Sequence, residues 1–137
     1  ILTGILGEGS ALDSFGLGNL DYLTIETDGT YHTSDILKVS YENASAIGFG
    51  VDEGSIEQAL SNEKVKQYNA MLSLEALPQK CKECVYSTLC GGGSLPHRYS
   101  EANRFNNPSI YCEEMYTLFH HAIEVFTQAI EAEIENG

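Results

Sequence analysis

The fold is decided by residues 81–94, which read CKECVYSTLCGGGS. Cys81 and Cys84 are two residues apart, a spacing that lets one tight turn direct two thiolates at the same ion or cluster. Cys90 follows in the same segment, and Cys112 is the fourth and last cysteine of the chain. The spacing therefore predicts a closed, four-coordinate site with three ligands from one loop and a fourth from a distant element.

The residues around these cysteines suit an anionic site. Gly91–Gly93 lack Cβ atoms, which allows close backbone approach and N–H groups directed at sulfur. Cys112 is expected in the first turn of a helix, where the partial positive charge favours a thiolate. Arg98 and Arg104 are two of only seven basic residues, and we expect each either to offset the charge of the site or to pair with a surface acid.

Spacing alone leaves the identity of the site open between structural zinc, an iron–sulfur cluster, and disulfides or free thiols. The usual zinc ribbon has two CxxC knuckles, whereas this chain has one knuckle and two single cysteines. The apolar start of the sequence is short and no Lys or Arg precedes it, so it does not resemble a signal peptide. Disulfides are disfavoured for that reason.

Composition restricts the partners. Seven Lys and Arg stand against twenty Asp and Glu, giving a formal net charge of −13. Such a surface repels phosphate backbones and anionic lipids, so we expect neither nucleic acid nor membrane as a partner, and a cytoplasmic location. The charge serves solubility or, alternatively, contact with a basic peptide. A length of 137 residues suits one domain with a modest core.

Two β-rich runs, 20–27 and 30–39, flank Asp28-Gly29, which predicts a hairpin with a type I′ turn. Residues 40–54 and 78–108 are predicted to be loops. Short helices are predicted over 56–61, capped by Ser55, and over about 63–73, capped by Asn62 or Ser61. Together these elements predict an α+β fold with a small hairpin, short helices, an irregular cysteine loop and a long C-terminal helix.

That last helix is predicted over about 110–135. Ser109 is the expected N-cap, and Asn136-Gly137 is the expected end. Apolar residues recur every three or four positions and define one stripe: Met115, Leu118, Phe119, Ala122, Ile123, Phe126, Ala129, Ile130 and Ile134. We expect this stripe to pack onto the hairpin or onto a preceding domain.

The pattern Cys81-x2-Cys84-x5-Cys90-Gly-Gly-Gly, followed by Cys112, resembles the SPASM domain of radical S-adenosylmethionine (SAM) peptide maturases. The runs 26–31, 35–39, 95–100 and 105–112 look like the FxsB-type and cyclophane-forming subgroup. The resemblance implies one auxiliary [4Fe–4S] cluster held by the four cysteines, in an enzyme that cross-links or otherwise modifies a ribosomally made precursor peptide. A structural zinc-binding interaction module is the alternative.

The departures from the family are also informative. Ser34 and Ser94 stand where the family carries cysteine ligands of a first auxiliary cluster, and an earlier cysteine is missing. The CxxxCxxC motif of the SAM-cleaving cluster is absent as well. We therefore expect a one-cluster domain over 20–137, with no catalytic residue of its own. Residues 1–19 would lead in from an upstream radical SAM barrel, which alone would bind SAM.

The four histidines are expected to have structural, hydrogen-bonding or surface roles. His120 and His121 point about 100° apart on the helix, so they are assigned structural or solvent-facing roles. His97 lies in the cysteine loop, where a hydrogen-bonding role is expected, and His32 is expected to be exposed on the hairpin.

Overall fold

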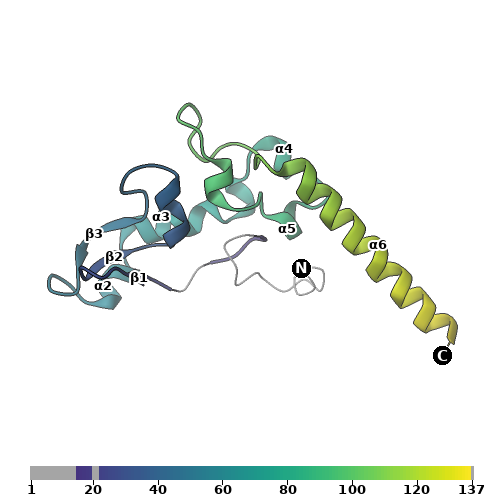
Figure 1. The fold of residues 1–137 in the computed structure, drawn as a ribbon, viewed down its shortest axis with the longest axis horizontal. Helices are drawn as coiled ribbons and strands as arrows, with labels where there is room; N and C mark the ends of the chain where they lie inside the picture. Colours follow the sequence, from purple (N-terminus) through teal and green to yellow (C-terminus); the bar gives the residue numbers. More distant parts are fainter. Residues whose placement is uncertain (1–14, 20–21, 137) are drawn as a thin grey trace.

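The computed structural model describes residues 15–19 and 22–136. A small antiparallel sheet lies at one end, a compact set of short helices follows, and a long helix leads away from them (Figure 1). The elements in chain order are β1 (Thr24–Ile25), β2 (Thr30–His32), η1 (Asp35–Val39), β3 (Ala46–Gly50), α2 (Ile56–Leu60), α3 (Glu63–Met71), η2 (Leu74–Ala76), α4 (Gln79–Lys82), α5 (Ser87–Cys90), η3 (Leu95–Arg98) and α6 (Cys112–Asn136). The predicted α+β class is confirmed.

The hairpin is where the sequence places it, but its turn differs from the prediction. Gly29 N–H donates to the Glu26 carbonyl (2.9 Å), and Gly29 has φ +84°. Asp28 keeps a negative φ, which excludes a type I′ turn. The loop is instead a type I turn closed by a left-handed glycine. The Asp28 carboxylate accounts for this, because it accepts hydrogen bonds from the Thr30 N–H (3.0 Å) and hydroxyl (2.7 Å).

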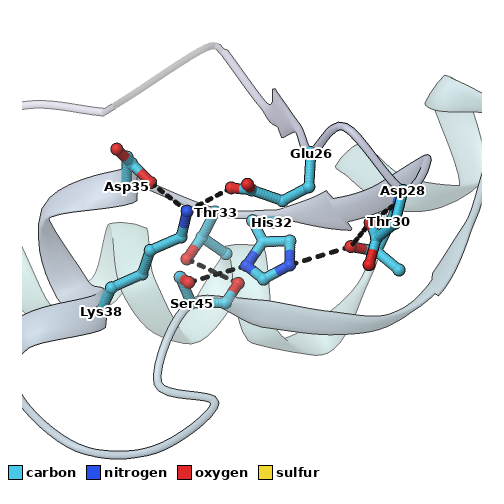
Figure 2. Close-up of polar contacts among 8 residues, drawn as sticks. All are labelled: Glu26, Asp28, Thr30, His32, Thr33, Asp35, Lys38 and Ser45. Carbon is cyan, nitrogen blue, oxygen red and sulfur yellow. Dashed lines mark hydrogen bonds and ion pairs between the residues drawn. The ribbon is translucent and has the colours of Figure 1, made fainter.

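The hairpin strands are shorter than predicted, and polar side chains lock the segment that follows them (Figure 2). Residues 35–39 form the 3₁₀ helix η1, and Lys38 on it bonds both Asp35 (2.6 Å) and Glu26. His32 is half-buried rather than exposed. Its Nδ1 lies 2.8 Å from the Ser45 hydroxyl and its Nε2 lies 3.1 Å from the Thr30 hydroxyl.

A third strand, β3, corrects the loop predicted for 40–54. It pairs with β2 through Thr30↔Gly50 and His32↔Ala46, so β3 carries a bulge opposite the short β2. Gly48, with φ +108°, provides the irregular backbone that this bulge needs. The strand closes a core of buried residues beneath the sheet: Tyr31, Ile47, Ala59 and Val65.

The helices after the sheet begin where predicted. Ser55 and Gln58 form a capping box at α2, and Asn62, rather than Ser61, caps α3 by accepting from Lys64 N–H (2.9 Å). The loop predicted over 78–108 is wrong in part, because α4, α5 and η3 lie within it. A second core joins α3 to η1 and η3 through Leu37, Tyr68, Leu72, Leu95 and Phe105.

The long helix α6 begins at Cys112, two residues later than predicted, after Ser109 accepts a hydrogen bond from Tyr111 N–H (3.1 Å). Only the start of its apolar stripe is buried, at Met115 and Phe119, where the helix meets α5. The helix does not pack onto the hairpin, which lies at the other end of the molecule (Figure 1). Leu118, Val125, Ile130 and Ile134 are exposed. Across residues 15–19 and 22–136, no helix is long and apolar enough to span a membrane.

The bulge in β3 gives a first prediction. In Gly48→Ala, the new Cβ meets no atom within 4 Å, so its cost is the strained backbone alone. We expect a loss of about 1–3 kcal/mol in unfolding free energy, measured by urea denaturation. Ser61→Ala, at an exposed position, is the control. Equal stability of the two variants would contradict the conformation assigned to Gly48.

Candidate metal centre

Short helical turns fix the backbone around three of the cysteines. Pro78 precedes α4, and its carbonyl accepts from the Cys81 N–H (2.9 Å). The Cys81 carbonyl in turn accepts from the Cys84 N–H (3.1 Å). Helix α5 then ends at Cys90, whose N–H donates to the Tyr86 carbonyl (2.7 Å). The knuckle predicted from spacing is therefore built from two helical turns in succession.

Three consecutive left-handed glycines then reverse the chain. Gly91, Gly92 and Gly93 have φ values of +60°, +79° and +71°. A Cβ on Gly91 would lie 2.1 Å from the carbonyl oxygen of Gly16, and one on Gly93 would lie 3.0 Å from the Met115 sulfur. The glycines thus let the loop lie directly against residues 15–19 on one side and α6 on the other, which brings Cys90 toward Cys112.

Residues 15–19 form no helix or strand, yet they make specific contacts with this region. Gly16 N–H donates to the Cys90 carbonyl (3.0 Å), and Phe15 packs edge-on against Phe119 with ring centroids 5.8 Å apart. The rest of the predicted leading segment, residues 1–14, lies outside the described part of the chain.

All four cysteines line one cavity of about 380 Å³ between the loop and the start of α6. None of them forms a disulfide. Cys81 is buried, and Cys84, Cys90 and Cys112 are partly buried. The structure therefore brings together the residues that the spacing selected, while their role as ligands stays a prediction. The charged side chains of the cavity wall are Lys80, Glu83 and Glu113.

Burial sets the protonation state of the thiols. It raises the pKa of Cys90 to about 11, although a backbone hydrogen bond from Gly92 opposes the change. Burial also raises the pKa of Cys81, and negative charge on Cys112 adds to that shift. Both thiols are therefore protonated at neutral pH, and binding a metal would release their protons.

The outer wall of the cavity is aromatic. Tyr86 and Tyr116 line it with ring centroids 4.9 Å apart, and the Tyr86 hydroxyl lies 2.8 Å from Nδ1 of His120. Sequence reasoning missed this wall. The available signal was the helical spacing of Cys112, Tyr116 and His120, which at intervals of four residues share one face of α6.

The two arginines near the site have different environments. Arg98 is buried in η3 beside the cavity, and ionised Cys81 and Cys90 would act on its charge. Arg104 is exposed, and its guanidinium lies 4.2 Å from the ring centroid of Tyr41 and 5.0 Å from that of Tyr99. Neither forms an ion pair with an acidic side chain of the described residues, so the predicted pairing with a surface acid is not seen for either.

The donors at this cavity are sulfur atoms and backbone N–H groups. Besides the four thiols, Tyr86 N–H lies 3.5 Å from the Cys84 sulfur, and Gly92 N–H is directed at Cys90. One zinc ion at about 2.3 Å from each sulfur would draw all four within about 4 Å of one another. Among the described residues, no three His, Cys, Asp or Glu side chains are grouped closely enough to hold one ion.

The other residues singled out in the sequence lie away from the cavity wall. Ser34 is buried and bonds the Tyr22 hydroxyl (3.4 Å), and Ser94 precedes η3. His97 packs edge-on against Tyr111, with ring centroids 4.8 Å apart.

No family model matches the chain, and no curated protein matches it. One solved structure, described as "Native anSMEcpe with bound AdoMet", is of a radical SAM enzyme and is similar in fold. The match has a TM-score of 0.69 at 19% sequence identity and covers 93% of this chain. It covers 33% of the other protein, so the chain spans about a third of that enzyme's length.

The raised pKa of Cys90 gives a second prediction. In metal-free folded protein, the alkylation rate of Cys90 will rise with pH to a midpoint near 11, because the thiolate is the reactive form. In urea, the midpoint will lie near the ordinary value of 9.0. Mass spectrometry of peptides after timed iodoacetamide treatment measures both.

The same shift predicts a loss of stability at alkaline pH. The folded state holds the Cys90 proton more tightly than the unfolded state does. The contribution of this protonated thiol to the free energy of unfolding is therefore complete below pH 9 and is lost between about pH 9 and 11. Identical alkylation midpoints in folded and unfolded protein would contradict this environment for Cys90.

Proposed function

We propose that this chain binds one [4Fe–4S] cluster through Cys81, Cys84, Cys90 and Cys112, as an auxiliary domain of a radical SAM enzyme that modifies a ribosomally made peptide. The convergence of all four cysteines on one cavity carries the proposal. The similarity in fold to part of an AdoMet-bound radical SAM enzyme supports it, as does the SPASM-like cysteine pattern.

One observation favours a cluster over a single zinc ion. The cavity that the four cysteines line is far larger than one ion requires. Structural zinc sites instead hold four ligands tightly around one centre. The zinc-binding interaction module remains the second candidate, and metal analysis separates the two.

Within this proposal the cluster would supply electron transfer or hold the loop against α6, since four cysteine ligands leave no iron position for substrate. SAM would bind to the upstream radical SAM domain, because this sequence has no CxxxCxxC motif. The domain over 20–137 would border the channel that holds the precursor peptide. The acidic surface suits a basic peptide segment.

The exposed stripe of α6 suits the upstream domain as its partner. Three members of that stripe, Leu118, Ile130 and Ile134, are exposed. Burying such a stripe against a second domain is the usual source of stability for an amphipathic helix.

The cluster assignment predicts the metal content. After anaerobic reconstitution with iron and sulfide, the chain will hold about four irons and become brown. A variant with Cys81, Cys84, Cys90 and Cys112 replaced by Ser will hold none. One zinc and no iron in the reconstituted protein would overturn the cluster and favour the zinc module.

The role in peptide modification is tested in the longer protein that joins this chain to a radical SAM domain. In Cys112→Ala, SAM cleavage without peptide will persist at a reduced level, while peptide modification will fall by orders of magnitude. Ser94→Ala is the matched control, because Ser94 lies in the same loop but not on the cavity wall. Mass spectrometry of the peptide is the measurement, and full modification by Cys112→Ala would refute the role.

A further inference from the structure

Arg98 is a buried cation whose charge is not balanced by any acidic side chain of the described residues. It is 2% exposed. Its Nε donates to the Phe105 carbonyl (3.1 Å) and one terminal nitrogen, Nη2, donates to the Ala76 carbonyl (3.4 Å). The other terminal nitrogen, Nη1, is buried without a hydrogen-bond partner in this part of the chain. Burying a charge and a donor in this way is costly unless an anion lies nearby.

The unpartnered nitrogen lies beside the cysteine cavity. Gly92 lines that cavity, and a Cβ on Gly92 would be 3.3 Å from Nη1 of Arg98. Burial lowers the pKa of Arg98, and negative charge on Cys81 and Cys90 opposes this change. Nη1 therefore lies close to Gly92 of the cavity wall, and thiolates at Cys81 and Cys90 are the negative groups that act on the Arg98 charge.

We propose that Arg98 is the charge-compensating and positioning residue of the cysteine site, which stabilises the anionic, metal-loaded thiolates and raises the reduction potential of a bound cluster. The second half of this inference rests on the proposed function; the first half applies to any metal bound by these thiolates. Outer residues that donate to metal ligands commonly contribute 10–100-fold to metal affinity.

The geometry explains why this position requires arginine. Two of its nitrogens are held by the Ala76 and Phe105 carbonyls, which fixes the plane of the guanidinium and leaves the third, Nη1, buried close to Gly92 of the cavity wall. A lysine has a single ammonium group on a flexible stem. It cannot bond both carbonyls and also present a further N–H group in a fixed plane. Gly92 leaves room for the Arg98 guanidinium, because a Cβ at that position would lie 2.9 Å from the Leu77 side chain and 3.3 Å from Nη1.

The test compares Arg98→Met, Arg98→Lys and the control Arg104→Met in the reconstituted full chain. Arg104 is a suitable control because it is exposed and stacks on Tyr41 and Tyr99. Two quantities are measured: the rate of metal loss to a chelator, and the midpoint potential in a redox titration followed by electron paramagnetic resonance. Circular dichroism of each metal-free variant checks that it folds.

We expect Arg98→Met to lose metal about 10–100-fold faster than the unaltered chain and to have a more negative potential. Arg98→Lys will recover part of the potential, since it keeps the charge, while Arg104→Met will match the unaltered chain. A merely structural role would accelerate metal loss but would leave the potential unchanged in the fraction that retains a cluster.

An unchanged potential and an unchanged rate of metal loss in Arg98→Met would overturn the inference. If Arg98→Met does not fold, Arg98→Gln decides the matter, because it also removes the charge but keeps polar groups that can bond the two carbonyls. A potential equal to that of Arg104→Met, together with tenfold faster metal loss, would then leave only a structural role. If the unaltered chain binds zinc and no iron, the proposed function fails, and the rate of zinc loss from the same variants still decides the role of Arg98.

Discussion

Four cysteines line one cavity of a chain whose net charge is already −13, and thiolates gathered there would repel one another. The local structure around the cavity answers that constraint. Backbone N–H groups of Tyr86 and Gly92 face sulfur, and Cys112 begins α6, where the helix presents partial positive charge. The buried guanidinium of Arg98 adds a full positive charge beside the cavity. The N–H groups, the start of α6 and Arg98 each supply positive potential, and none of them is an exposed charged side chain.

The arrangement also depends on backbone shape. The glycines at 91–93 adopt conformations that other residues rarely take. They let the loop contact the backbone of residues 15–19 at Gly91 and the Met115 side chain of α6 at Gly93. The loop over 78–108 has few buried apolar residues besides Leu95 and Phe105, so these close approaches add to a small core. Metal ligation by the four cysteines would join two of these segments, the loop and α6, which is why folding and binding are expected to be coupled here.

The sequence predicted the positions of the hairpin, the caps at Ser55 and Asn62 and the long helix. It also selected the four cysteines that line one cavity, whereas their role as ligands stays a prediction. It failed on β3, because a strand with Gly48 and Gly50 has weak local preference and forms only by pairing with β2. It failed on the turn at Asp28-Gly29, because the bonds from Thr30 to the Asp28 carboxylate outweigh the dipeptide preference. One-turn helices such as α4 are too short for a periodic signal, and the burial of Arg98 depends on distant carbonyls that no local pattern specifies.

The charge distribution along α6 has a consequence for the stability of the helix. Glu113 and Glu114 favour its first turn, but no Lys or Arg follows Arg104 in the sequence, and three glutamates lie near the end of the helix: Glu131, Glu133 and Glu135. Negative charge at a helix C-terminus opposes the helix dipole, and like charges four residues apart repel. Salt or a cationic neighbour that screens these glutamates would therefore stabilise the helical turns that carry them.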